Sequence, residues 1–499
     1  MSHVAFRPRG EDLEADFDFV VVGSGAGGAA AVVQLARGGA KVCIVEAGAW
    51  RDPHDYPESA FGGMRDLMDN FGALVTMGRA FWPVVQARVV GGTTVVNSAI
   101  CVRTPGDLFR QWETEHGVTG LEARVYEKQD QLERDLSVEE VSSPAMGRSN
   151  ELAYIGEEKL GWPSRHVMRR YAKGCAGTGM CIQGCRAEKK QSLNLVFVPE
   201  VQQRGGTVVS CAPVEKVLFE GRRAVGVTGR FEHPVSKAKG ARFTLRAKKA
   251  VLVAASVTHT PVLLMKSGVK LPKVGHFFRS HPGTGMFGVY DQHVDMNLGT
   301  TQGWASTAFR DKPGFKLEML SIPPELFASR LAGGGSQLME RLERYRHLAM
   351  WVVAVRAEST GRVRKTLFGN PQVSYTLNEA DMRKLREGLK LLALQHFAAG
   401  AKKVIPSIYG MPYELTADQV NLLDDAPLDP RCYVAVLSHL FGGAVMGRDE
   451  KTSVTDGRGR VHGYEGLVVA DASVIPTNLG VNPQHTIMAL AQVFAEALL

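Results

Sequence analysis

The chain has 499 residues, of which 44% are apolar and 22% charged, and a formal net charge of +8. This composition excludes a disordered or fibrous protein, and the length predicts about three domain-sized units. The absence of any block of five or six like charges predicts no nucleic-acid binding. Glycine is frequent, at 54 residues, which indicates tight turns and backbone held close to a ligand.

The N-terminal segment has no apolar core and no twin arginine, so we expect no export signal. No stretch reaches 18 consecutive apolar residues, so we expect no transmembrane anchor. Seven cysteines are few and odd in number, which argues against a secreted disulfide scaffold. We therefore predict a cytoplasmic protein.

The first chemical motif is a glycine-rich turn between a strand and a helix. Residues 16–22, DFDFVVV, predict a buried strand, and GSGAGG follows at residues 23–28. Residues 29–39, AAAVVQLARGG, predict a helix that ends at a glycine pair. Residues 41–46, KVCIVE, predict a second buried strand. This βαβ order predicts a dinucleotide-binding unit of the Rossmann type.

Each residue of this unit has an expected role. Gly23 permits the tight turn, Gly25 lets backbone N–H groups approach a pyrophosphate, and Gly28 lets the helix pack on the strand. The helix N-terminus offers partial positive charge to the phosphates. Glu46 is expected to bond an adenosine ribose. The unit alone does not distinguish NAD from FAD.

The C-terminal segment favours a flavin. LVVAD, residues 467–471, predicts a buried strand ending in an acid, and a long apolar helix follows, with Asn482 as its cap, Pro483 in its first turn and its end at Leu499. A helix N-terminus can face a group that gains negative charge, as a reduced flavin does.

Further motifs occur in a fixed order along the chain. They are RVVGGTTVVNSAI (88–100), VLVAASVTHTPVLLMKSGV (251–269), VGHFFRSHPG (274–283), SHLFGGAVMG (438–447), GRVHGYEGLVVADASVIPT (459–477) and GVNPQHTIMALA (480–491). Together with the first βαβ unit, they make the chain resemble the glucose–methanol–choline (GMC) oxidoreductases over nearly its whole length.

The resemblance implies an α/β fold, α+β overall. In this GMC fold, a Rossmann-like FAD-binding lobe is interleaved with a substrate lobe built on an antiparallel sheet with helices. The FAD-binding lobe would comprise residues 1–60, 81–106, 191–283 and 436–499, the substrate lobe residues 286–435, and a connecting or cap region residues 107–190. A lid is expected within residues 50–80.

The resemblance also implies FAD-dependent oxidation of an alcohol to the carbonyl, by hydride transfer to flavin N5. His439 matches the family's active-site histidine, a residue type suited to accept the hydroxyl proton, and Asn482 matches the second member of the pair. Asn482 would hydrogen-bond the substrate oxygen. His485 is expected on another face of the helix, His281 at a structural position, and His259 packed or facing solvent.

The cofactor-binding residues implied by the unit and the resemblance come from every FAD-lobe segment. They are Gly23, Gly25, Gly28, Glu46, Gly91, Gly92, Thr93, Asn97, Val214, Ala254, Asp471, Ala472, Asn482, Pro483 and Thr486. The substrate is expected to be a small-molecule alcohol. The many Leu, Met, Phe and Trp residues of segment 286–435 favour a hydrophobic or ring-bearing one.

Cys175, Cys181 and Cys185 form a cluster in KGCAGTGMCIQGCRAEKKQS. The stretch is similar to the catalytic subunits of FAD-dependent glucose and gluconate dehydrogenases, in which three such cysteines hold a [3Fe–4S] cluster. Arg186 stands where those dehydrogenases usually have proline. Three readings stay open: an iron–sulfur cluster, a zinc site, or a disulfide or free thiols in a structural turn.

These readings imply different electron acceptors. With a cluster, which Cys101 or Cys211 could complete, electrons would pass to a redox partner protein or a quinone. Without one, the enzyme could be an oxygen-using alcohol oxidase. Two further alternatives are a non-redox GMC enzyme, such as a lyase or a light-driven decarboxylase, and a flavoprotein whose main task is electron transfer.

Overall fold

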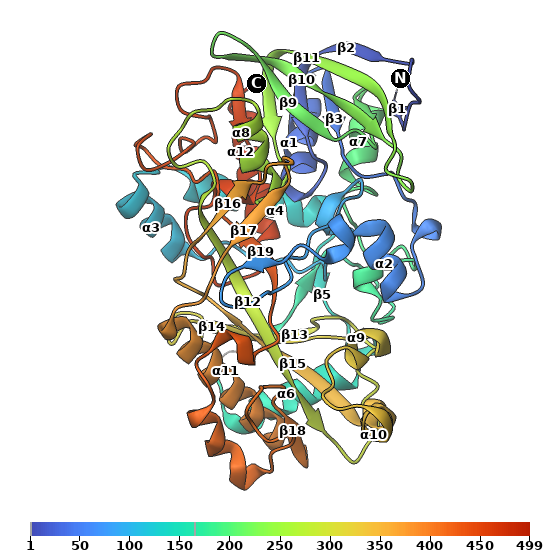
Figure 1. Cartoon of the computed structure of the whole chain (residues 1–499), viewed down its shortest axis with the longest axis vertical. Coiled ribbons are helices and arrows are strands. Elements are labelled where there is room, and N and C mark those ends of the chain that lie inside the picture. Colours follow the sequence, from blue (N-terminus) through green and yellow to red (C-terminus); the bar gives the residue numbers. More distant parts are fainter. Residues whose placement is uncertain (1, 164–165) are drawn as a thin grey trace.

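Two β-sheets, one of eight strands and one of ten, organise the residues that the computed structural model describes, 2–163 and 166–499. Both chain termini lie near the eight-stranded sheet, at one end of the molecule in Figure 1. The ten-stranded sheet extends towards the other end, where helices α6, α9, α10 and α11 surround it. This mixed α/β architecture confirms the predicted fold class.

The eight-stranded sheet has a parallel centre. Its parallel strands are β1 (His3–Val4), β8 (Thr207–Val209), β3 (Val42–Val45), β2 (Leu13–Val22), β11 (Lys239–Val253) and β20 (Leu467–Val469). Both faces of this centre are covered, so its strands are continuous runs of buried β-branched residues, as in VVV at the end of β2. Strands β10 (Arg223–Glu232) and β9 (Val214–Glu220) extend the sheet in antiparallel fashion.

Helices α1 (Ala26–Arg37) and α12 (Gln484–Glu496) pack against each other beside this sheet. The predicted βαβ unit and the C-terminal strand and helix are therefore present. The predicted cap is wrong, because α12 begins at Gln484 and Pro483 occupies the N-cap position. The Asn482 side-chain oxygen instead accepts a hydrogen bond from Lys316, and no side chain caps the helix.

The ten-stranded sheet is mostly antiparallel. Its strands are β4 (Thr76–Met77), β17 (Pro371–Ser374), β16 (Gly361–Lys365), β12 (His276–Val289), β15 (Leu348–Val355), β14 (Phe315–Met319), β13 (Trp304–Ser306), β6 (His166–Val167), β18 (Lys403–Ile405) and β19 (Val436–Phe441). The long strand β12 pairs with β15, β16, β18 and β19, and it passes through the middle of the molecule in Figure 1.

Helix α11 (Glu379–Ala398) covers this second sheet and packs on β15, β12 and α6. As the sequence predicts, Asn378 caps it, accepting the N–H of Asp381. The predicted lobe border at residues 283–286 lies inside β12, and β19 pairs with β12 as well. The lobe boundaries therefore stay a prediction.

The remaining α-helices and β-strands connect and cover the two sheets. They are α2 (Ala60–Leu67), α3 (Gly106–His116), α4 (Glu122–Asp135), β5 (Glu139–Glu140), α5 (Ser143–Met146), α6 (Arg148–Leu160), β7 (Arg169–Arg170), α7 (Phe197–Gln203), α8 (His259–Lys266), α9 (Pro324–Ala328) and α10 (Gly335–Glu343). Among the described residues, no helix combines the length and the apolar character needed to cross a bilayer.

Candidate active site

A single cavity of about 1350 Å³ is lined by residues of both sheets. It exceeds the ~300–1,000 Å³ of ordinary small-molecule pockets, so it has room for a large cofactor together with a substrate. The glycine turn after β2 and Glu46 line one part of it, and His439 and Asn482 line another. The fold thus joins the predicted dinucleotide site to the predicted reacting residues.

Two different structural requirements explain the glycines of the first turn. Gly23 has φ +95°, and a Cβ there would lie 2.3 Å from the Ala254 carbonyl oxygen. A Cβ on Gly28 would lie 1.9 Å from the carbonyl oxygen of Gly23, so Gly28 permits the close packing of α1 on the turn. Gly25 is open by contrast, since its nearest neighbour is Gly92 Cα at 3.8 Å. Gly25 therefore leaves free the space that a ligand would fill.

The N-terminus of α1 is prepared for an anion. Its N-cap residue is Gly25, no side chain caps it, and its first turn has no acidic residue. Gly25, Ala26 and Gly27 line the cavity, so the unpaired N–H groups and the positive end of the helix dipole lie at its wall. This arrangement fits a pyrophosphate.

Glu46 ties three segments together at the same wall. Its Oε2 accepts the backbone N–H and the hydroxyl of Ser24, at 2.9 and 2.7 Å, and its Oε1 accepts the N–H of Gly48 at 2.8 Å. The N–H of Gly91 donates to the Ser24 hydroxyl at 2.9 Å. Ser24 thus links the glycine turn to the loop of residues 91–97, a role that the motif pattern did not reveal.

The loop of residues 91–97 is tied to the start of α12. Thr93 and Asn97 line the cavity. The Asn97 side-chain amide donates to Gln484 Oε1 at 2.6 Å, and the Tyr171 hydroxyl contacts Asn97 Oδ1 at 2.8 Å and Gln484 Oε1 at 2.7 Å. Two predicted cofactor-binding segments, 387 residues apart in sequence, are therefore joined directly.

Asp471 is buried at the end of β20 and lines the cavity beside Ala472 and Ala254. Its Oδ2 accepts the Ser256 N–H at 2.9 Å and the Thr260 hydroxyl at 2.5 Å. Its Oδ1 accepts the N–H of Ser473 at 2.8 Å and also the hydroxyl of Ser473. Burial raises the pKa of Asp471 above its usual value, although these donors act in the opposite direction.

His439 lies on β19, with its side chain against His281 of the neighbouring strand β12. The two Nδ1 atoms are 3.1 Å apart, and the N–H of Gly480 donates to Nε2 of His281 at 2.9 Å. Because Nε2 of His281 accepts that N–H, the hydrogen of His281 lies on Nδ1 and is donated to Nδ1 of His439. Nε2 of His439, which then carries the hydrogen of the neutral ring, is the nitrogen left for a ligand. Burial, helped by the charge of Lys316, lowers the pKa of His439 well below 6.5. The imidazole is consequently neutral near pH 7.

Asn482 is contacted by a residue that the sequence analysis did not single out. Its Oδ1 accepts a hydrogen bond from Lys316 Nζ at 2.8 Å, and the same ammonium is paired with Glu318 at 2.6 Å. Lys316 and Glu318 are both buried and stand two residues apart on β14, on the same face of the strand.

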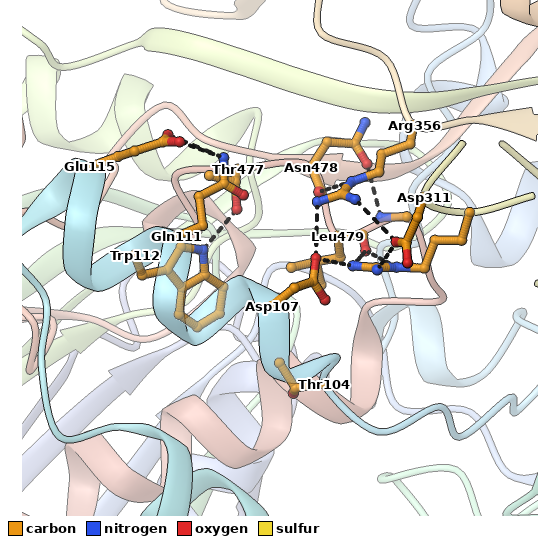
Figure 2. A network of polar contacts seen from close by, with 12 residues as sticks. Thr104, Asp107, Gln111, Trp112, Glu115, Asp311, Arg356, Thr477, Asn478 and Leu479 are labelled. Carbon is orange, nitrogen blue, oxygen red and sulfur yellow. Dashed lines mark hydrogen bonds and ion pairs between the residues drawn. The ribbon is translucent and has the colours of Figure 1, made fainter. Parts of the chain in front are cut away.

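The chain that leads to Asn482 is held by a polar network (Figure 2). Arg310 donates through Nε and Nη2 to the Leu479 carbonyl at 3.1 and 3.0 Å, and Arg356 donates to the Asn478 carbonyl at 3.2 Å. Asp107 of α3 pairs with both guanidinium groups, at 3.1 and 3.5 Å. Segment 478–480 is therefore anchored just before the predicted site residue.

Some of the other predicted residues line the cavity, and others are buried away from it. Val214 and Pro483 line it, whereas the Thr486 hydroxyl lies 2.8 Å from the hydroxyl of Thr104, away from it. His485 is buried off the cavity, with Nε2 3.2 Å from the carbonyl of Gln129. Burial lowers the pKa of His485 to about 4.

His259 is partly exposed, with 39% of its side chain accessible, which agrees with the expectation that it packs or faces solvent. It lines the cavity, and its Nε2 lies 2.8 Å from Oδ2 of Asp69, inside the predicted lid segment. The pair connects α8 to the segment that follows α2. The sequence pattern alone offered no signal for this contact.

The three clustered cysteines are unpaired, as are the other four. Guanidinium nitrogens of Arg170 lie 3.8 Å from the Cys175 sulfur and 3.3 Å from the Cys181 sulfur. Burial raises the pKa of the Cys181 thiol, but the charges of Arg170 and Lys190 outweigh it and leave this pKa below its ordinary value. The neighbouring Ile182 lines the cavity.

Ligand atoms of a single metal ion must lie close together. Within the described part of the chain, the one group of three or more such atoms within 4.8 Å of one another is Asp52, His54 and Asp55, which is exposed. The sulfurs of Cys175, Cys181 and Cys185 do not meet this spacing. The arrangement therefore does not support the zinc reading.

Comparison with known proteins gives matches over almost the whole chain. The family description "GMC oxidoreductase" matches residues 64–283 and 357–491. A GMC-type oxidoreductase of Mycobacterium tuberculosis is 34% identical over 488 residues, 96% of this chain and 75% of that protein. A long-chain-alcohol oxidase of Arabidopsis thaliana is 27% identical over 522 residues, 96% of this chain and 67% of that protein.

A solved structure shows the same fold. A variant of formate oxidase from Aspergillus oryzae, studied for modification of its FAD, matches with a TM-score of 0.74. The match covers 97% of this chain and 98% of that one at 19% sequence identity.

Proposed function

The chain belongs to the GMC oxidoreductases, and from this premise we propose that it oxidises an alcohol to the carbonyl compound with FAD as hydride acceptor. The observation that carries the proposal is that one cavity contains both the predicted dinucleotide site and the predicted reacting residues. The cavity joins a glycine turn suited to a pyrophosphate with a neutral histidine and an asparagine amide.

The residues around the cavity fit FAD. Gly25 and the N-terminus of α1 would hold the pyrophosphate, Glu46 the adenosine ribose, and Val214 the adenine side. Loop 91–97, Asp471 and the start of α12 would hold the flavin end. Gly28, Gly91 and Thr486 would support these segments from behind.

The chain's own residues would handle the hydroxyl group. FAD, when bound, supplies N5 as the acceptor of the hydride from the carbinol carbon. Nε2 of His439 would accept the hydroxyl proton as the hydride leaves, which requires the neutral tautomer with its hydrogen on Nδ1, so both His439 and His281 must first change tautomer. The Asn482 amide hydrogen-bonds the substrate oxygen and orients the carbinol carbon. Both side chains line the same cavity, which supports this division of roles.

The substrate proposed is a hydrophobic alcohol. Apolar side chains, among them Leu320, Ile322, Leu326, Met350 and Val352, line part of the cavity. The name of the Arabidopsis relative, a long-chain-alcohol oxidase, agrees with this choice.

Anaerobic bleaching of the flavin by an alcohol series tests the proposed function. We expect bleaching in the dark that strengthens as the alkyl chain grows. A holoprotein that no alcohol bleaches would exclude the proposal and favour a lyase or a light-driven decarboxylase.

We propose oxygen as the electron acceptor. In the alternative, electrons pass from FAD through a [3Fe–4S] cluster to a partner protein or a quinone. Relatives named as oxidases support the first version. So does Arg170, whose guanidinium contacts the sulfurs of both Cys175 and Cys181, where iron would have to bind.

We expect purified holoprotein to contain less than stoichiometric iron and sulfide. Its spectrum should show flavin bands without the broad absorption of a cluster, because the Arg170 guanidinium contacts two of the three sulfurs. Anaerobic purification with iron and acid-labile sulfide assays makes the measurement. Three irons per chain would establish the cluster version instead.

Replacing Asn482 by leucine is expected to slow flavin reduction by about 10- to 100-fold, the effect of losing ~1.5–3 kcal/mol of hydrogen bonding in the transition state. Stopped-flow reduction at saturating alcohol makes the measurement. The flavin content serves as control, because Asn482 also lines the cofactor cavity. An unchanged reduction rate at full flavin content would exclude Asn482 from the reaction.

A further inference from the structure

A buried ammonium group contacts the reacting end of the cavity. Lys316 is 1% exposed and Glu318 3% exposed, so both charges have lost almost all their water. Burying a charge costs several kcal/mol unless it is paired and hydrogen-bonded, and replacing such a pair by apolar residues is often neutral or stabilising. A buried ion pair is therefore weak evidence for a role in stability. Because Lys316 contacts Asn482, a role in the active site explains the pair better.

The chemistry of the ammonium group determines the orientation of the Asn482 amide. A lysine ammonium has only hydrogen-bond donors, so the amide atom that faces it at 2.8 Å must be the oxygen. The oxygen and nitrogen of an asparagine are otherwise hard to distinguish, and the network of partners assigns them. The NH₂ group of Asn482 therefore points away from Lys316.

Among the described residues, the hydrogen bond found for the Asn482 side chain is the one from Lys316 to its oxygen, and none is made by this NH₂ group. Asn482 lines the cavity, as does His439, whose Nδ1 already faces His281. The Asn482 N–H donors and Nε2 of His439 are thus two polar groups of the cavity that can meet a substrate oxygen.

We propose that Lys316 is a positioning residue, which holds the Asn482 amide with its N–H groups towards the substrate oxygen. The inference rests on the proposed function and adds a third side chain to it. The substrate oxygen accepts a hydrogen bond from the Asn482 N–H group and lies beside Nε2 of His439. Without Lys316 the amide can turn over, and its oxygen then takes the place of the N–H donors beside the substrate oxygen.

Glu318 offsets the free-energy cost of burying the Lys316 ammonium group. Its carboxylate neutralises the ammonium at 2.6 Å, and the two side chains approach from the same face of β14. Lysine alone would leave an uncompensated charge beside the reacting atoms.

The test compares four holoproteins by anaerobic stopped-flow reduction with a saturating long-chain alcohol. They carry Glu318→Gln, Lys316→Met with Glu318→Gln, Glu318→Gln with Asn482→Leu, and all three changes. Using Glu318→Gln as the background avoids an unpaired buried carboxylate, which could prevent folding. Lys128→Met is the matched control, because Lys128 is also buried and paired, with Glu496 at 2.6 Å, but does not line the cavity.

We expect Lys316→Met to slow reduction by about 10-fold or more in the Glu318→Gln background. It should cause no further loss once Asn482 is leucine, because Lys316 acts through that amide. Lys128→Met should reduce at the rate of the unsubstituted protein. A merely structural role of Lys316 would give similar losses with and without Asn482.

Two results overturn the inference in different ways. Equal losses from Lys316→Met in the presence and absence of Asn482, or no loss at all, show that Lys316 does not position the amide while the proposed function stands. Failure of any alcohol to bleach the unsubstituted holoprotein removes the proposed function, and the inference with it.

Discussion

Replacing His439 by alanine is expected to lower turnover by about 10²- to 10⁴-fold, the usual contribution of a general base, while FAD stays bound. His439 is the candidate because it lines the cavity and its Nε2 is left for a ligand, while Nδ1 faces His281. Turnover per bound flavin, measured with a long-chain alcohol, makes the test.

A base must be unprotonated to act, and burial together with Lys316 lowers the pKa of His439 well below 6.5. The rate of flavin reduction should therefore stay constant as the pH falls through 6.5 and decline only at lower pH. This acid limb should be missing in His439→Ala.

His485→Ala is the matched control, because His485 is a buried histidine three residues from Asn482 that contacts the backbone of Gln129 instead of the cavity. We expect it to lower stability but to keep turnover per flavin. Full activity of His439→Ala, or an equal loss in His485→Ala, would contradict the assignment of the base.

Replacing Gly25 by alanine is expected to weaken FAD binding by about 10- to 100-fold without unfolding the protein. The backbone of Gly25 has φ −68°, which any residue adopts, and its Cβ would lie 3.8 Å from the nearest atom. The extra methyl group would occupy the space of the pyrophosphate, and such overpacking costs roughly 1–3 kcal/mol. Titration of the apoprotein with FAD measures the affinity, and thermal unfolding measures the fold.

Alanine substitutions at two other glycines serve as controls for this prediction. Gly334→Ala should change neither quantity, since a Cβ there meets nothing within 4 Å and φ is −148°. Gly28→Ala should lower the unfolding temperature, because its Cβ would lie 1.9 Å from a carbonyl oxygen. Unaltered FAD affinity in Gly25→Ala would show that the phosphates do not bind at this turn.

Local sequence patterns predicted the first βαβ unit and the C-terminal strand and helix well. Each is a contiguous stretch whose apolar run or glycine spacing reflects its own backbone. The resemblance to a family then predicted which distant segments share a cavity. Among them, segments around Gly25, Asn97, His439 and Asn482 do line one cavity.

The residues that hold this site in place were not predictable in the same way. Lys316 lies in FKLEM, an ordinary strand sequence, and its partner Asn482 is 166 residues away. Ser24 occupies a variable position of the glycine motif, and its role appears only once Glu46 and Gly91 are beside it. The capping prediction for Asn482 failed because α12 begins at Gln484, with Pro483 at its N-cap, and the Asn482 oxygen faces a remote ammonium instead.

The position of β20 has a consequence for biosynthesis. This strand pairs with β11 at the parallel centre of the first sheet, and α12 packs on α1 from the first dinucleotide-binding unit. During translation, the edge of β11 has no β20 to pair with and the apolar face of α1 has no α12 to pack against. Both surfaces stay exposed until residues 467–496 leave the ribosome. Such exposed edges favour aggregation, so we expect the nascent chain to be prone to aggregation until β20 and α12 have been synthesised.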